Sequence, residues 1–304
     1  MKRCARQYVR DIEMEMFFIF YDKPSEVLSQ LIRTAFIAEE GSRLIVADFS
    51  AIEARVIAWL ADEKWRMEVF ADGGDIYCAS ASEMFKVPVE KHGKNKELRQ
   101  KGKIAELACG YGGSVGALKA FGADKMGLTV TEMQSIIDKW RTSSPNICKL
   151  WRDVENAAKS AVRYKKAYQC AKGIIYEVVD EYLFATLPSG RKIAYYKPSI
   201  EEDQLKYEGT LQVGGWGINR TWGGKLVENL VQAIARDCLA KAMLRIDKAG
   251  YKIIMHVHDE IICEMPNGVG SLAEMVEIMS QPIESLPGLI LNADGYETLY
   301  YRKD

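Results

Sequence analysis

The sequence predicts an α+β fold, in which a small, mostly antiparallel sheet is built from the two ends of the chain around a helix-rich insertion. Three observations predict it. The β-branched apolar run "SRLIVADFS" (42–50) indicates a strand that ends in an acid. The stretch "IIMHVHDEIICEM" (253–265) indicates a pair of strands. Between them, apolar residues recur mostly at helical spacing.

The first half of the chain is predicted to be mainly helical outside the first strand. Helical spacing begins at Ser25 in "SEVLSQLIRTAF" and returns in "IEARVIAWLADE" (52–63) after that strand. A further helix, "ELRQKGKIAELACGYG" (97–112), meets its first glycine at Gly102 and leads into a glycine cluster at 110–116. Helical segments fill 131–162, and Pro145 is the predicted break between them.

The second half begins with strands. From Gly173 to Gly217 the pattern is strand-like, with Pro-Ser-Gly (188–190) as a hairpin turn. A long helix, "KLVENLVQAIARDCLAKAMLRIDKAG", closes with Gly250 as its predicted C-cap. The strand pair follows, then another helix and a final short strand near "NADGYETLYYRK" (292–303).

Bulk composition indicates a globular protein with no overall basic character. The chain has 304 residues, 48% of them hydrophobic, and a formal net charge of -1. Its seven cysteines are scattered without a CxxC pair, which indicates free thiols in a reducing cytosol. The N-terminus has neither the pattern of a signal peptide nor that of a membrane span, so no membrane partner is expected. Locally, residues 91–103 hold six Lys or Arg and one acid.

Two acids stand where apolar strand runs end, Asp48 and Asp259, and the second is followed by Glu260. Neighbouring carboxylates cannot all stay ionised without a counter-charge, which a pair of divalent cations about 4 Å apart would supply. Mg²⁺ is the natural candidate because it prefers oxygen ligands. The alternative is that Asp259 and Glu260 form a polar hairpin turn and that Asp48 caps the next helix.

The helix after the basic segment carries a stripe of functional side chains. Arg99, Lys103, Leu107 and Tyr111 recur every four residues and are predicted to lie along one helix face. Two cations followed by an apolar and an aromatic side chain would match a triphosphate, then a sugar and a base. The alternative is an amphipathic helix with a basic start and an apolar end.

Taken together, three stretches resemble family A DNA polymerases. "ADFSAIEARVIAWL" is similar to the first palm motif, "RQKGKIAELACGYG" to the fingers-helix motif R-x3-K-x3-F-x3-YG, and "HVHDE" to the third motif, VHDE. The resemblance runs from about Ser25 to the end and is closest to polymerases of bacteriophages and prophages. It implies a right-hand polymerase palm with helical fingers.

The resemblance also implies the roles of individual residues. Asp48 and Asp259 would hold two Mg²⁺ ions, with Mn²⁺ as a substitute, and Glu260 and His258 would flank the primer terminus. Near the incoming nucleotide, Arg99 and Lys103 would bind the triphosphate and Tyr111 would lie near the templating position. Glu53 would be the steric gate that excludes a ribose 2′-hydroxyl. Leu107 stands where the family usually has an aromatic residue, and Tyr77 stands where it has a histidine. Gln232 and Arg55 would contact DNA.

By the same resemblance the chain divides into a divergent N-terminal remnant (1–24), a first palm part (25–60), fingers with connecting strands (61–225) and a second palm part (226–304). The thumb and exonuclease have no counterpart in residues 1–24. The expected partners are primer-template DNA and dNTPs, with a separate chain as a source of the thumb. The expected location is the cytoplasm of a bacterial host or virus-infected cell.

The predicted function is DNA-templated addition of dNTPs to a primer 3′-hydroxyl with pyrophosphate release. One alternative is a catalytically weak or inactive nucleic-acid-binding fragment that needs another chain. A single-subunit RNA polymerase shares the two acids and the basic stripe, but Glu53 argues against it. A two-metal nuclease has no need of the stripe from Arg99 to Tyr111.

Overall fold

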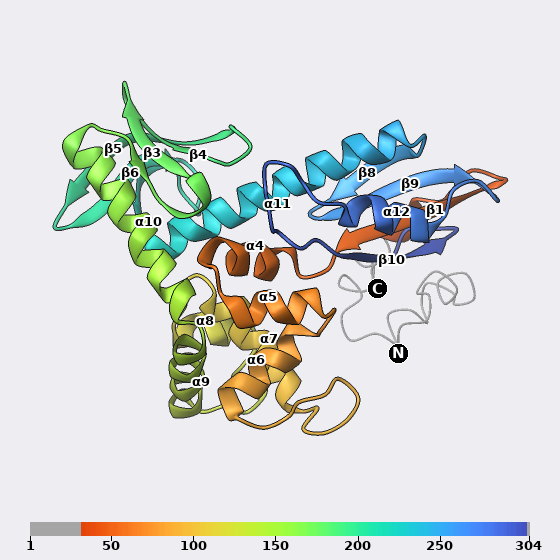
Figure 1. The fold of residues 1–304 in the computed structure, drawn as a ribbon, viewed down its shortest axis with the longest axis horizontal. Coiled ribbons are helices and arrows are strands. Elements are labelled where there is room, and N and C mark those ends of the chain that lie inside the picture. Colours follow the sequence, from red (N-terminus) through yellow and green to blue (C-terminus); the bar gives the residue numbers. More distant parts are fainter. Residues whose placement is uncertain (1–31, 303–304) are drawn as a thin grey trace, which may run out of the picture. The chain divides into compact units, whose positions relative to one another are not determined.

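The computed structural model describes residues 32–302 (Figure 1). These residues form two compact units. Unit 1 combines residues up to Ser50 with 239–281 and the stretch from Asn292 onward, and unit 2 combines 51–238 with 282–291. The predicted helix from Ser25 lies largely outside the described residues, and within them Ile32–Ala35 forms a short 3-10 turn, η1.

Unit 1 is built around a four-stranded sheet in the order β10-β1-β9-β8, in which all neighbours are antiparallel. Two segments from opposite ends of the chain therefore share one sheet, as predicted. Its strands are β1 (Ser42–Phe49), β8 (Lys252–Val257), β9 (Glu260–Pro266) and β10 (Ala293–Thr298). Helix α12 (Leu272–Ser280) packs on β1 and β10.

The core of unit 1 explains why β1 reads as a continuous apolar run. Residues 44–47 are all buried, because both faces of this central strand are covered. On one face Leu44 and Val46 cluster with Ile262 of β9 and with Tyr301 from the C-terminal segment. The exposed exception near the end of the strand is Asp48.

Unit 2 contains the helical insertion. Its helices are α4 (Ile52–Ala61), α5 (Lys64–Ala71), α6 (Ile76–Phe85), α7 (Leu98–Cys109), α8 (Val115–Ala120), α9 (Val130–Ser143) and α10 (Pro145–Tyr164). The break between α9 and α10 falls at Pro145, which confirms the prediction. Helix α11 (Gly223–Lys248) contains the boundary between the units, and Gly250 follows its end with φ 88°.

Unit 2 also holds a six-stranded antiparallel sheet in the order β2-β3-β4-β5-β6-β7. The strands are β2 (Tyr168–Gln169), β3 (Ile175–Val179), β4 (Tyr182–Thr186), β5 (Lys192–Glu201), β6 (Gln204–Thr210) and β7 (Trp216–Thr221), with the 3-10 turn η2 (Ala171–Gly173) after β2. The hairpin turn at 188–190 joins β4 to β5 as predicted.

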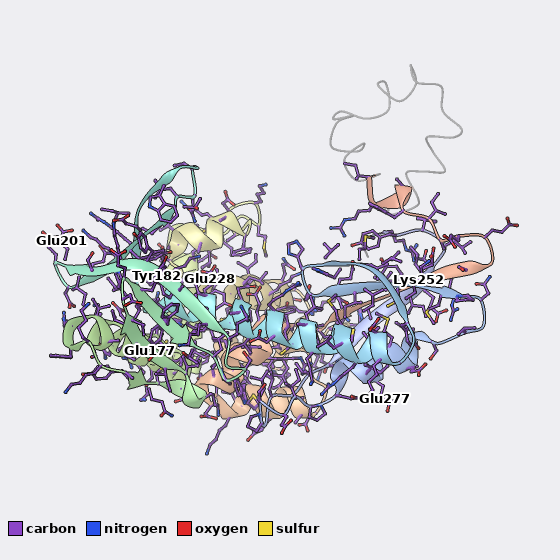
Figure 2. All side chains as sticks on the ribbon, turned by 90° about the horizontal axis from the view of Figure 1, so that it is seen from above. Glu177, Tyr182, Glu201, Glu228, Lys252 and Glu277 are labelled. Atoms are coloured by element: carbon purple, nitrogen blue, oxygen red, sulfur yellow. The ribbon has the colours of Figure 1, made fainter. Side chains whose placement is uncertain are left out.

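The two faces of this sheet differ. Helix α10 covers one face, on which Tyr176, Leu183 and Tyr195 are buried. Glu177 and Tyr182, labelled in Figure 2, share the other face with Phe184, because Phe184 is the cross-strand partner of Glu177 and lies two residues from Tyr182. The six-stranded sheet of unit 2 thus has one face buried under α10 and a second, more exposed face that carries aromatic side chains.

Among residues 32–302 no helix has the length and apolar character needed to cross a membrane.

Candidate active site

Asp48 lies near the end of β1, between two other acids. Its cross-strand partner on β9 is Glu260, and its partner on β10 is Asp294. Directly opposed residues of an antiparallel pair project to the same face with Cβ atoms about 5 Å apart. The three carboxylates therefore form a row across the sheet.

Asp259 joins this row from the turn between β8 and β9. The turn consists of residues 258 and 259, with His258 in the left-handed region at φ 55°. The backbone N–H of Phe49 donates to the carbonyl oxygen of Asp259 at 3.3 Å, which fixes the turn against the end of β1. Asp48 does not cap the following helix, since the N-cap of α4 is Ala51 and makes no side-chain cap bond.

The close acids change the titration of Asp48. Although the residue as a whole is exposed, partial burial of its carboxyl group, and then the negative charges of Asp259, Glu260 and Asp294, raise its pKa to about 6. The carboxylate therefore stands in surroundings that favour either a proton or a cation.

Glu260 is held from the other side by the C-terminal segment. The Tyr301 phenol donates a hydrogen bond to Glu260 Oε1, and Arg33 Nη1 donates to the same phenol oxygen at 2.9 Å. Burial and the neighbouring Glu260 carboxylate raise the pKa of Tyr301, so the phenol stays protonated as a donor.

The donor set of this row fits a hard divalent cation such as Mg²⁺. Within the described part of the chain, no group of three or more His, Cys, Asp or Glu side chains is arranged to hold a metal ion by itself. Mg²⁺ is commonly bound by one or two carboxylates together with substrate phosphates and water, and it has no need of an all-protein cage. Asp48 and Asp259 are the residues that could provide the two carboxylates.

A second set of predicted residues meets in unit 2 around Tyr77. The Arg99 guanidinium carbon lies 5.3 Å from the centroid of the Tyr77 ring, and Lys103 Nζ lies 5.8 Å from it. Arg99 also forms an ion pair with Asp75 at 2.7 Å. Although partial burial opposes it, the hydrogen bond and charge of Arg99 lower the pKa of Asp75, with help from backbone donors at the start of α6.

Gly102 explains how Tyr77 comes so close to α7. A Cβ atom at this position would lie 2.2 Å from the carbonyl oxygen of Tyr77 and 3.0 Å from the side chain of Ala81. Only a residue without a side chain allows α6 and α7 this approach. The first glycine of the predicted helix is thus a packing requirement.

The buried side of α7 is fixed by a polar network. Glu106 receives two bonds from Arg66 of α5, at 2.5 and 2.8 Å, and one from the indole N–H of Trp140 at 2.8 Å. Arg66 is fully buried and donates further to Ser144. Removing either Arg66 or Glu106 would leave the other as an unpaired buried charge, which is strongly destabilising. The pair therefore holds α7, the helix that carries Arg99, in its position.

Tyr111 lies beyond α7, which ends at Cys109, so the predicted stripe does not continue along one helix as far as Tyr111. Its hydroxyl donates to Glu53 Oε2 of α4 at 2.8 Å. Burial and the Glu53 carboxylate raise the pKa of Tyr111. Leu107, within the helix, is 39% exposed.

Besides His258, two further predicted DNA contacts lie in unit 2 and have different surroundings. Gln232 lies exposed on α11. Arg55 is only 4% exposed, and its guanidinium donates to the carbonyl oxygen of Ile290 at 3.1 Å and lies over the Phe70 ring. Arg55 therefore packs within unit 2 in this structure, and its contact with DNA stays a prediction.

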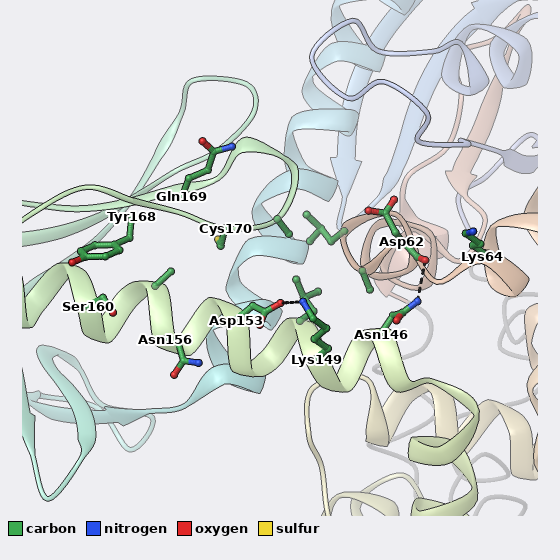
Figure 3. Close-up of a pocket in the computed structure, with 15 residues that line it drawn as sticks. Asp62, Lys64, Asn146, Lys149, Asp153, Asn156, Ser160, Tyr168, Gln169 and Cys170 are labelled. Atoms are coloured by element: carbon green, nitrogen blue, oxygen red, sulfur yellow. Dashed lines mark hydrogen bonds and ion pairs between the residues drawn. The ribbon is translucent and has the colours of Figure 1, made fainter.

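A cavity of about 770 Å³ lies elsewhere in unit 2, where the end of α4 meets α10 and β2 (Figure 3). Its rim carries the Lys149–Asp153 ion pair and a bond from Asn146 to the carbonyl oxygen of Asp62. None of the predicted site residues lines it. We assign it no part in the site.

The chain belongs to DNA polymerase family A, whose family model matches residues 24–181. The DNA polymerase of Bacillus phage SP02 is 51% identical over 99% of this chain and 47% of its own length. DNA polymerase I of Rhizobium leguminosarum is 31% identical over 77% of this chain, which is 20% of that protein. The resemblance to phage polymerases predicted from the motifs is confirmed.

The fold agrees with this membership. The solved structure described as "POL domain of Pol1 from M. smegmatis complex with DNA primer-template and dNTP" superposes with a TM-score of 0.59 at 21% identity, covering 91% of this chain and 43% of that one. The α+β palm-and-fingers fold is thereby confirmed. The chain spans about half the length of its phage relative and less of the other relatives named here. Family A DNA polymerases are metal-dependent in general.

Two residues of the site were missed from the sequence. Asp294 lies near the start of the final strand and does not end an apolar run, so it lacked the signal that pointed to Asp48. Tyr301 carried no comparable signal, because an aromatic residue near a chain end is usually a packing residue.

Proposed function

We propose that this chain is the catalytic part of a DNA-templated DNA polymerase, which adds dNTPs to a primer 3′-hydroxyl by two-metal nucleotidyl transfer and releases pyrophosphate. The observation that carries the proposal is the position of Asp48 in the sheet, between Glu260 and Asp294 and beside the turn of Asp259. Membership of family A supports the same reaction.

In this proposal the acids of unit 1 organise the reacting groups. Asp48 and Asp259 hold the cations, and Glu260 and His258 flank the primer terminus. When bound, two Mg²⁺ or Mn²⁺ ions supply positive charge at the 3′-hydroxyl and at the triphosphate. The raised pKa of Asp48 supports this role, because after burial its further causes are the negative charges of Asp259, Glu260 and Asp294, which a cation would offset.

Unit 2 supplies the residues for the nucleotide. Arg99 and Lys103 bind the triphosphate, where their charges act on its oxygens. Arg99 is paired with Asp75 in this structure, so a phosphate must share or replace that partner. Glu53, held by the Tyr111 hydroxyl, stands as the steric gate against a ribose 2′-hydroxyl.

The proposed partners are primer-template DNA, contacted by Gln232, and dNTPs. A separate chain that supplies a thumb is part of the same proposal, since duplex grip adds many phosphate contacts. The proposed compartment is the cytoplasm of a bacterial host cell, which the similarity to a phage polymerase supports.

Primer extension by the purified chain tests the proposal. With Mg²⁺ and four dNTPs, Asp259→Asn should reduce the rate of single-nucleotide addition by about three orders of magnitude, roughly 4 kcal/mol of barrier. Asp247→Asn is the matched control, because Asp247 is an exposed acid at the end of α11, and its rate should equal that of the unmodified chain.

The assay is run with and without a candidate upstream polymerase fragment, and with rNTPs in place of dNTPs. Equal extension by Asp259→Asn and the unmodified chain would refute the proposal. Preference for rNTPs over dNTPs would instead identify an RNA polymerase and remove the steric-gate role of Glu53.

A further inference from the structure

We propose that Tyr301 is a positioning residue for Glu260, and that Arg33 orients its phenol. This inference rests on the proposed function, in which Glu260 flanks the reacting centre. It assigns a role in the site to the C-terminal segment after β10, which no sequence motif marks.

The directions of the hydrogen bonds show that the Tyr301 phenol donates its proton to Glu260. A phenol has one proton to donate and can also accept. Arg33 Nη1 donates to the Tyr301 oxygen at 2.9 Å, so the phenol proton is left for Glu260 Oε1, to which Tyr301 donates. The Arg33 guanidinium carbon also lies 5.3 Å from the centroid of the Tyr301 ring, which fixes the ring from a second direction.

Tyr301 is held in place by packing and by a backbone hydrogen bond. The residue is 2% exposed and packs into the cluster of Leu44, Val46 and Ile262. Its backbone N–H donates to the carbonyl oxygen of Phe36 at 2.9 Å. A donor locked by packing and by backbone bonds holds its acceptor more precisely than a surface side chain could.

The hydrogen bond from Tyr301 controls where the Glu260 carboxylate lies relative to Asp48. Glu260 is the cross-strand partner of Asp48, and their charges repel one another. A glutamate side chain has several rotamers in which it could turn away from that repulsion. A hydrogen bond to a charged group is among the strongest that side chains make, so Tyr301 keeps the Glu260 carboxylate in one place beside Asp48.

The variant Tyr301→Phe tests the inference, because it keeps the ring and its packing and removes only the hydroxyl. We expect kcat for single-nucleotide addition to fall about tenfold, as for the loss of one charge-assisted hydrogen bond, with KM for the dNTP unchanged within about twofold. Tyr164→Phe is the matched control and should leave both constants unchanged, because Tyr164 is 62% exposed at the end of α10 and belongs to unit 2.

A double-mutant cycle with Glu260→Ala separates positioning from a general effect on packing. If Tyr301 acts through Glu260, adding Tyr301→Phe to Glu260→Ala should cost less than about twofold in kcat. A tenfold loss that persists without Glu260 would overturn the inference.

The same four proteins are compared by thermal unfolding, which requires no polymerase activity. Tyr301→Phe should lower the unfolding temperature clearly in the unmodified chain and much less in Glu260→Ala, since the lost bond is already absent there. Additive temperature shifts would overturn the inference. Coupled shifts in a chain that extends no primer even with the upstream polymerase fragment would refute the proposed function, while the hydrogen bond between Tyr301 and Glu260 would still be supported.

Discussion

At the scale of one residue, Asp48 occupies a position that is unfavourable for the stability of the fold. Residues 44–47 of its strand are buried, whereas its own side chain is exposed in a row with two other acids. Folding brings these negative charges together, which costs free energy in the absence of a counter-ion. Such an arrangement is typical of a functional site, because packing alone does not require it.

The raised pKa of Asp48 predicts how its removal changes stability with pH. An acid whose pKa rises from 3.8 to about 6 on folding destabilises the folded chain above the lower value, as the carboxylate ionises. Asp48→Asn should therefore stabilise the chain at pH 7.5 by on the order of 1 kcal/mol, a discounted figure because solvent screens an exposed carboxylate.

The gain should shrink as the pH falls below about 6 and disappear near pH 3, below the ordinary pKa of 3.8, because Asp48 is then protonated in both the folded and the unfolded chain. The measurement is thermal unfolding in EDTA at both pH values, with Asp247→Asn as the control. A destabilised Asp48→Asn chain at pH 7.5, or an equal difference at both pH values, would contradict the electrostatic account.

Candidate site residues could be singled out from the sequence where an apolar strand run ends in an acid, as at Asp48 and Asp259. It could not be predicted for Asp294, because only the pairing of β10 with β1 places this acid opposite Asp48. The burial of Arg55 could not be predicted either, because it depends on contacts with the carbonyl oxygen of Ile290 and the ring of Phe70, which are distant in the sequence. Neither outcome follows from local sequence.

At the scale of elements, the packing of α6 against α7 decides the surroundings of Arg99 and Lys103. The two helices approach so closely that Gly102 has no room for a Cβ atom beside the Tyr77 carbonyl. The network of Glu106 with Arg66 and Trp140 holds α7 from its other side. The basic side chains are therefore positioned by contacts made by their neighbours in the helix.

Gly102→Ala should separate α6 from α7. We expect a loss of about 1–3 kcal/mol of stability from overpacking, together with a raised KM for the dNTP, because Tyr77 and Arg99 shift relative to one another. The readouts are thermal unfolding and steady-state primer extension.

Gly116→Ala in α8 provides the comparison, because a Cβ atom there meets nothing within 4 Å. Alanine favours a helix over glycine by up to about 1 kcal/mol, so this variant should be neutral or more stable. If both substitutions have the same effect, the close approach at Gly102 does not control the site.

Most elements could be predicted from apolar spacing, including the hairpin of β8 and β9 and the break at Pro145. The end of α7 could not be, since the four-residue spacing continues to Tyr111 although the helix stops at Cys109. The strands between Gly173 and Gly217 were recognised, but their union in one six-stranded sheet depends on pairings that no single strand encodes.

At the scale of the whole molecule, each unit carries one part of the proposed chemistry. Unit 1 holds the acids and unit 2 holds the basic residues and the steric gate. The order of the motifs along the chain was enough to predict the family, because each motif combines several specific residues. The meeting of β1, β9 and β10 in one sheet was expected only as a pairing of chain ends, since its register is set by tertiary packing.

The proposed reaction requires that Asp48 and Asp259 hold divalent cations together with nucleotide phosphates. Its most direct test is Mn²⁺ binding measured by electron paramagnetic resonance, with primer-template DNA and a non-hydrolysable dNTP analogue. The unmodified chain should bind two ions, and Asp48→Asn and Asp259→Asn should each lose at least one. The same ion count in all three proteins, or no bound ion in the unmodified chain, would contradict the account.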